Sequence, residues 1–135
     1  MSTSRHIVVG RGSTMGAGEA EITDDVRYGD LLILSGRAAV DPATLAVLDA
    51  GFAAQAQRVL ADIDAVLEAG GSSRSQVLRV ECFLADASDF PAWNGIWCEH
   101  FAPPRPARTT VVCGFAVPGI LIELQVTAGI GGVEA

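Results

Sequence analysis

The sequence lacks the features that mark several large classes of protein. No apolar stretch approaches the roughly 20 residues that a membrane span requires, and the first six residues lack the apolar run that export needs. Only nine Lys and Arg stand against 16 Asp and Glu, which gives a net charge of −7 and no basic footprint for a nucleic acid. We therefore expect neither a membrane protein nor a nucleic-acid partner.

Cysteine and histidine are also scarce, and neither follows a pattern. Cys82, Cys98 and Cys113 form no Cys-x-x-Cys pair, and His6 and His100 have no ligand spacing. The sequence therefore predicts no metal site, and it contains no recognisable cofactor motif. An odd number of cysteines without a pairing pattern suits a reducing compartment, so we expect a cytoplasmic protein.

Apolar residues, in contrast, are abundant. They make up half of the 135 residues, and charged residues only 19%. This length fits a single domain over residues 1–135, in which we interpret 1–20 as an N-terminal strand and a glycine-rich loop (10–20) and 131–135 as a tail. A small domain this apolar is expected to bury surface against other copies of itself, although alanine content alone also raises the apolar fraction.

Residue periodicity predicts an α+β fold. The continuous apolar run Leu31–Leu34 is typical of a strand buried on both faces, and the stripe within 51–69 predicts a helix that ends at Gly70-Gly71. A second helix is expected after a cap at Ser88 or Asp89. The predicted strands are 6–9, 22–28, 31–39 and 77–84, followed by two at the C-terminus. Right-handed crossovers would place both helices on one face of a mixed sheet.

The C-terminal stretch carries the most specific pattern. We interpret residues 108–116 and 120–128 as two strands joined by a Val-Pro-Gly turn, with Arg108 at the start of one and Glu123 on the more polar face of the other. A guanidinium can hold a carboxylate bidentately while a nearby carboxylate acts on a water. A salt bridge, or two solvated side chains, is the alternative reading of the same spacing.

Four segments resemble positions of the Rid family, the reactive intermediate deaminases, also called YjgF-like proteins. These segments are Leu34-Ser35-Gly36, Trp93-Asn94, the run from Pro106 to Val111, and Ile122-Glu123-Leu124. The resemblance covers roughly residues 26–130. It implies a chorismate-mutase-like mixed β-sheet with two helices on one face, a homotrimer with clefts between subunits, and cofactor-free hydrolysis of enamine or imine intermediates to 2-keto acids and ammonia.

The same resemblance assigns roles to individual residues. Arg108 corresponds to the residue that binds the substrate carboxylate, and Glu123 to the one thought to position or activate the hydrolytic water. Ser35 and Asn94 correspond to residues that line the cleft, and the backbone at Thr110 lies where relatives contact the substrate nitrogen or its water. The expected partner is therefore a small carboxylate-bearing substrate.

Two positions beside these depart from the family pattern, and a third shapes the backbone. Gly36 permits a ligand or another backbone to approach closely. Arg37 stands where relatives tend to have Gln, and Ile22 where they usually have a pocket Tyr. A second cation near Arg108 would favour a larger or more acidic substrate, whereas pairing with Asp41 would give Arg37 no such role.

These departures leave two further hypotheses beside a small-imine deaminase. One is a specialised Rid-like enzyme that acts on a bulkier pathway intermediate. The other is a non-catalytic trimer that binds a small ligand in its clefts.

Overall fold

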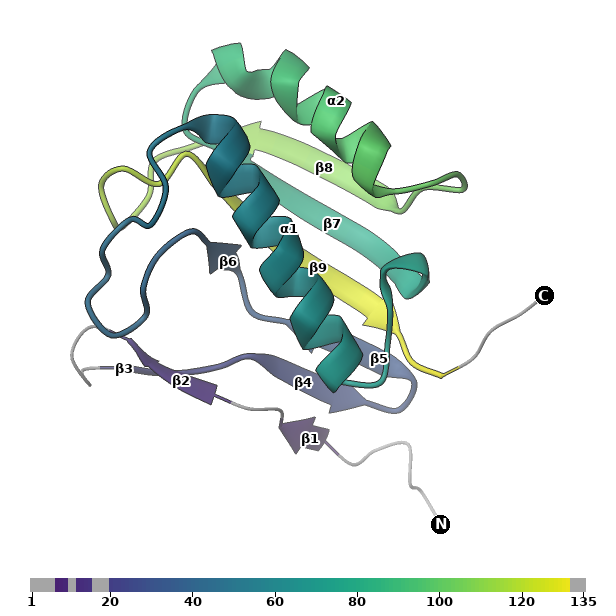
Figure 1. Ribbon diagram of the computed structural model, residues 1–135. Coiled ribbons are helices and arrows are strands. Elements are labelled where there is room, and N and C mark those ends of the chain that lie inside the picture. The colour runs from purple at the N-terminus through teal and green to yellow at the C-terminus, as the bar shows by residue number, and fades with distance from the viewer. Residues whose placement is uncertain (1–6, 10–11, 16–19, 132–135) are drawn as a thin grey trace.

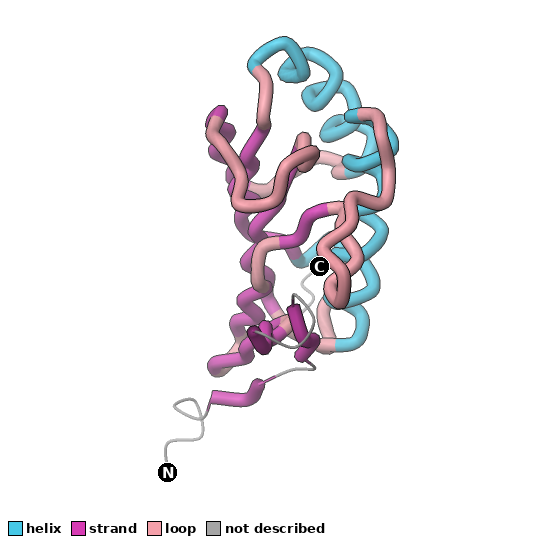
Figure 2. The backbone as a smooth tube through the Cα atoms, turned by 90° about the vertical axis from the view of Figure 1, so that its left-hand side faces the viewer, coloured by secondary structure: helices cyan, strands magenta, loops and turns pink. Residues whose placement is uncertain are grey.

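The protein folds into two layers, a β-sheet and a pair of helices that cover one of its faces. The computed structural model describes residues 7–9, 12–15 and 20–131. Figure 1 shows α1 and α2 lying across the same side of the sheet, and the view turned by 90° in Figure 2 separates the strand layer from the helix layer. Within these residues no helix is both long and apolar enough to cross a membrane.

The described strands form one seven-stranded sheet and one two-stranded sheet. The large sheet has the order β1-β4-β5-β9-β7-β8, with β6 paired to β9, and the small sheet pairs β2 with β3. The strands are β1 (Ile7–Val9), β2 (Gly12–Met15), β3 (Ala20–Thr23), β4 (Asp25–Tyr28), β5 (Leu31–Leu34), β6 (Arg37–Ala38), β7 (Val77–Leu84), β8 (Ala107–Val112) and β9 (Ile122–Gly129).

One pairing makes the sheet mixed. β7 and β8 run parallel, whereas β9 is antiparallel to β5, β6 and β7. Parallel neighbours need a crossover connection, and helix α2 (Phe90–His100) provides it after the short 3-10 helix η3 (Ala87–Asp89). The prediction of an α+β fold with both helices on one face of a mixed sheet is confirmed.

Helix α1 (Phe52–Ala69) forms as its apolar stripe predicts. Gly70 follows its last residue, and Gly71 has the positive φ of +86° that commonly ends a helix. The stripe packs on the inner face of β9 and β7, together with two aromatic residues of α2, Trp93 and Trp97. The buried members of the α1 stripe are Ala56, Val59, Leu60, Ile63, Val66 and Leu67.

The predicted C-terminal hairpin is wrong. β8 and β9 do not pair, because β7 lies between them: Val80 is opposite Arg108 on one side and opposite Val126 on the other. The segment 113–121 therefore passes from the edge of the sheet to its centre instead of turning back on itself. The first strand also ends at Val112 and not at residue 116.

Three local predictions are also corrected. Leu31 and Ile33 are 40% and 45% exposed while Leu32 and Leu34 are buried, so β5 is covered on one face and not on two. The stretch predicted as strand 31–39 is interrupted at residues 35–36. Part of the segment predicted as a loop, Gly12–Met15, is strand β2.

The cap of the second helix and the register of β7 are two further local features. Asp89 is the N-cap of α2, one of the two predicted positions, but its side chain makes no capping hydrogen bond. Asp86 caps the preceding 3-10 helix and accepts a hydrogen bond from the Ser88 amide at 2.8 Å. The register of β7 shifts between Val77 and Arg79. Leu78 is the extra residue at this irregularity, and it is 52% exposed.

Candidate functional site

Arg108 is held from the helix layer. Its Nη2 donates to Asn94 Oδ1 at 2.8 Å, and its Cζ lies 5.1 Å from the ring centroid of Trp97 and 5.7 Å from that of Phe90. A guanidinium over aromatic faces is stabilised by the ring quadrupole. No described residue forms an ion pair with Arg108, so an orientated and partly exposed cation stands at the sheet edge without a carboxylate partner.

The sequence places these contacts through helix periodicity. Phe90, Asn94 and Trp97 lie at i, i+4 and i+7 of α2 and therefore share one face of the helix. Trp93 and Trp97 anchor that helix, because both rings are buried and they meet edge to face with centroids 6.0 Å apart. Anchoring α2 on β7 and β8 brings this face directly over Arg108.

Glu123 lies on the other face of the sheet. In β9 it is opposite Ala38 of β6 and Phe83 of β7, and its neighbours Ile122 and Leu124 point into the helix-covered core. Burial raises the pKa of the Glu123 carboxyl above its usual range. A carboxyl with a raised pKa gains a proton more readily, as a general base near neutral pH requires.

A hollow of about 300 Å³ opens beside this carboxylate. Gly36 forms part of its wall, and a Cβ placed on Gly36 would lie 2.4 Å from Glu123 Oε2. No described residue makes a hydrogen bond or an ion pair with the Glu123 carboxylate. The other residues around the hollow are Phe83, Cys113, Gly114, Phe115, Ala116 and Gln125.

Arg108 and Glu123 do not meet within one chain. Arg108 contacts α2, whereas Glu123 faces the hollow on the side of the sheet away from the helices, and β7 separates their strands. The structure thus divides the predicted site in two. One half is the cation with Asn94, and the other is the carboxylate with Gly36.

Ser35 and Arg37 have other partners. The Ser35 hydroxyl donates to the Thr23 carbonyl, and Arg37 forms an ion pair with Asp24 at 3.1 Å. Asp41 instead accepts hydrogen bonds from two backbone amides of its own loop, so the pairing considered for Arg37 and Asp41 is wrong. Two strands, β9 and β7, also separate β6 from β8, so Arg37 is not beside Arg108 in the same chain.

Thr110 and Ile22 complete the predicted set. Thr110 shares the helix-covered face with Arg108, and its Oγ1 is buried. Burial raises the pKa of the neighbouring Cys82 thiol, an effect that contacts from Thr110 and Trp93 oppose. Ile22, in β3, is partly buried and pairs with Ser13 of β2.

Sequence reasoning missed the part that Phe90 and Trp97 take around Arg108. Both were visible as members of an apolar stripe, for which packing against the sheet is the ordinary reading. Trp93 fits that reading completely. Trp97 packs in the core and also lies beside the Arg108 cation. Phe90 is 41% exposed and mainly lies beside the cation. Their helical spacing from Asn94, which places all three side chains on one face, is the sequence signal that indicates this role.

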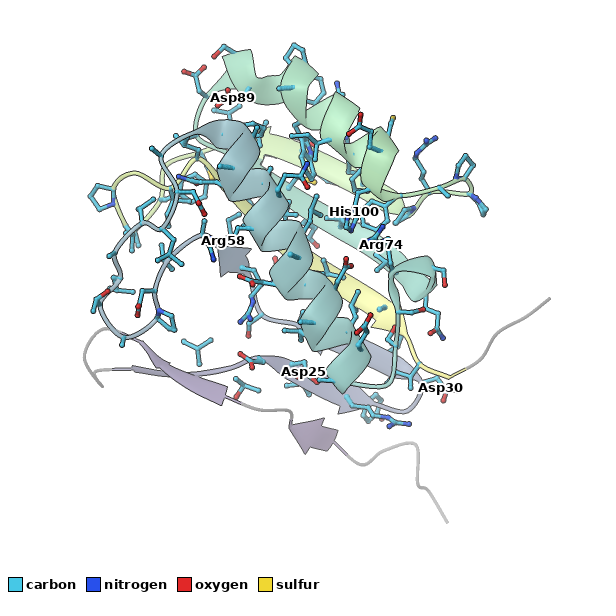
Figure 3. The ribbon with its side chains drawn as sticks, viewed as in Figure 1. Asp25, Asp30, Arg58, Arg74, Asp89 and His100 are labelled. Carbon is cyan, nitrogen blue, oxygen red and sulfur yellow. The ribbon has the colours of Figure 1, made fainter. Side chains whose placement is uncertain are left out.

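A second polar cluster lies at the far end of α2 from Asp89. Figure 3 shows Arg74 and His100 close together there, with Asp89 at the opposite end of the helix. Arg74 bridges Asp64 Oδ2 at 2.6 Å and the His100 carbonyl at 3.3 Å, and His100 Nε2 lies 3.4 Å from Asp64 Oδ1. Burial lowers the pKa of His100. These contacts tie α1, the 3-10 helix Arg74–Gln76 and α2 together beside a cavity of about 860 Å³.

Comparison with known proteins agrees with this architecture. The family described as "Endoribonuclease L-PSP" matches residues 17–130. A RutC family protein of Pyrococcus horikoshii is 32% identical over 103 residues, which cover 76% of this chain and 82% of that protein. Protein HMF1 of Saccharomyces cerevisiae is 31% identical over 112 residues, or 83% of this chain and 86% of the relative.

Solved structures give the same result. RidA from a Psychrobacter species has a TM-score of 0.78 at 28% identity, over 91% of this chain and 99% of that one. A YjgF family member from Neisseria meningitidis has a TM-score of 0.81 at 26% identity, over 96% and 99%. The chain belongs to the YjgF/RutC/Rid family, as the four sequence segments predicted.

Proposed function

We propose that the protein hydrolyses 2-imino acids, in equilibrium with their enamines, to 2-oxo acids and ammonia. The observation that carries the proposal is Arg108: a cation fixed by Asn94 and two aromatic rings, partly exposed, with no described carboxylate partner. Such a cation fits the carboxylate that every 2-imino acid bears next to its C=N bond. Membership of the Rid family supports the same general role.

The reaction needs few groups. Arg108 would bind the carboxylate and so fix the adjacent imine carbon, and Glu123 would take a proton from a water that attacks this carbon. The C–O bond forms as the C=N π bond breaks, and the proton passes from Glu123 to the nitrogen, which gives a carbinolamine. Glu123 then transfers the hydroxyl proton to the nitrogen, so that the C=O bond forms as the C–N bond breaks and ammonia leaves. Holding the reactants in place lowers the barrier, and the raised pKa of Glu123 suits a group that both accepts and returns a proton.

The two halves of the site require more than one copy of the chain. Because Arg108 and Glu123 lie on opposite sides of one sheet, a single substrate reaches both only if the Glu123 side of one copy faces the Arg108 side of another. The uncovered face also carries apolar side chains that a partner would bury, since Leu31, Ile33 and Val111 are all at least 40% exposed there. We therefore propose that the active site lies in clefts lined by two subunits, in the homotrimer that the family resemblance implies.

RNA cleavage, which the description of the matching family names, is less well supported by this chain. Its net charge of −7 gives no attraction for a phosphate backbone. The uncompensated Arg108 is a single cation in an aromatic setting, which fits one small carboxylate better than a polyanion.

A direct test uses imines generated in the cuvette from an L-amino acid and an amino-acid oxidase. The wild-type protein should speed the conversion of 2-iminopropionate and 2-iminobutyrate to the oxo acids, and Arg108→Ala should abolish the effect while circular dichroism and subunit assembly stay unchanged. Equal rates with wild-type and variant would refute the proposal. Binding of 2-oxobutyrate without any turnover would instead support a ligand-binding protein.

A further inference from the structure

We infer that Phe90 selects the side chain of the substrate, so that the site prefers 2-imino acids with a bulky apolar substituent over the alanine-derived compound. The inference rests on the proposed function and concerns a residue to which the family resemblance assigns no role. It starts from the position of the Phe90 ring, 5.7 Å from the Arg108 guanidinium carbon and 41% exposed.

The two rings beside Arg108 are not equivalent. Trp97 is only 6% exposed, and its tilted contact with Phe101 places it in the core, so a ligand has little access to it. Phe90, at the first position of α2, leaves much of its ring free. Arg108, which would bind the carboxylate, therefore lies between a buried aromatic ring, that of Trp97, and an accessible aromatic ring, that of Phe90.

The chemistry of the substrate brings its side chain to this accessible ring. In a 2-imino acid the first side-chain carbon is two bonds from the carboxylate carbon. A carboxylate seated on Arg108 therefore places the substituent within van der Waals reach of groups that flank the guanidinium. Asn94 occupies one of those positions with a polar amide oxygen bonded to Nη2, and Phe90 offers the apolar one. Burying a larger apolar substituent there is more favourable.

Phe90 is also free to act on selectivity without holding the fold. It begins the helix, follows Asp89 at the end marked in Figure 3, and is absent from the buried core around Trp93. Replacement by Ala removes the ring and replaces Phe with the stronger helix former. Replacement by Leu keeps an apolar side chain and removes the aromatic face that interacts with the cation.

The test compares leucine-derived and alanine-derived imines, and runs the stable oxo acids 4-methyl-2-oxopentanoate and pyruvate in parallel by calorimetry. The wild-type protein should favour the branched compound in both assays. Phe90→Ala should lower the ratio of the two kcat/KM values, and of the two affinities, about tenfold, chiefly through KM. Phe90→Leu should stay within about twofold of wild type. Leu48→Ala, an exposed loop position that is 45% accessible, serves as the matched control and should leave both ratios unchanged.

Each other outcome overturns a specific statement. An unchanged ratio in Phe90→Ala refutes selectivity at Phe90. Equal losses for both imines show that the ring merely orientates Arg108, and so does a Phe90→Leu variant that behaves like Phe90→Ala. Failure of the wild-type protein to accelerate any imine refutes the proposed function, whereas the oxo-acid affinities still decide whether Phe90 discriminates between side chains.

Discussion

The lack of space for a side chain between Gly36 and the Glu123 carboxylate leads to a specific prediction. A Cβ at position 36 would lie 2.4 Å from Glu123 Oε2 and 3.3 Å from Cδ, whereas ordinary contacts begin near 3.4 Å. In Gly36→Ala the carboxylate must therefore move by about 1 Å. Because the obstructing atom ends a flexible side chain that bonds to no described residue, the fold can absorb this shift.

The expected effect is on rate and not on stability. A displacement of about 1 Å at a reacting group can cost on the order of 100-fold in rate, or about 2.7 kcal/mol of activation free energy. The melting temperature should remain within a few degrees of wild type, since exchanging Gly for Ala also lowers the entropy of the unfolded chain. Continuous measurement of oxo-acid formation from 2-iminobutyrate would give kcat/KM.

Gly114→Ala provides the matched control for this variant. It adds the same methyl group to the same hollow, but no heavy atom lies within 4 Å of the new Cβ. We expect less than about a threefold effect on rate from this smaller perturbation. Wild-type kcat/KM in a folded Gly36→Ala protein, or equal losses in both variants, would refute the argument that the position of the Glu123 carboxylate matters.

Three further predictions concern pH, folding and the cation. Burial raises the pKa of Glu123 above its ordinary value of 4.5, so the stability that its protonated form contributes is fully present below pH 4.5 and is lost as pH rises through the folded pKa. The melting temperature of Glu123→Gln should therefore rise relative to that of wild type between about pH 4.5 and 8, and a constant difference would contradict this. Gln55 is fully buried, donates to two backbone carbonyls and accepts a hydrogen bond from the Leu121 amide at 2.8 Å. Gln55→Ala should therefore lower the free energy of unfolding, measured in urea, by about 3 kcal/mol. A loss below about 1 kcal/mol would show that other hydrogen bonds replace these three. Arg108→Lys keeps the charge but loses the planar guanidinium and its stacking on the aromatic rings. KM should therefore rise on the order of tenfold to a hundredfold. An unchanged KM would mean that charge alone binds the carboxylate.

The parts of the fold that follow from short-range pattern could be predicted from the sequence. The α1 stripe and β7 repeat with helical and strand periods, so both appear where expected. The hairpin error has a physical cause. A turn signal such as Val117-Pro118-Gly119 reports a change of direction, but it carries no information about a strand inserted from more than 20 residues earlier in the chain.

The site could be predicted in its residues but not in its arrangement. Arg108 and Asn94 were both selected, and the bond between them is present. The separation of these two residues from Glu123 depends on the face of the sheet that each side chain occupies and on the strand that lies between β8 and β9. That strand is β7. The interruption of the predicted strand 31–39 at Ser35 and Gly36 could not be foreseen either, and it makes β6 a separate strand paired with β9.

The central claim, that one substrate contacts Arg108 of one subunit and Glu123 of another, is tested most directly by subunit mixing. Arg108→Ala and Glu123→Gln should each be inactive alone. After unfolding together in equal amounts and refolding, a closed ring assembled at random has both intact residues at about a quarter of its interfaces. We predict recovery of about a quarter of wild-type activity. An inactive mixture that contains hybrid trimers would contradict the shared site.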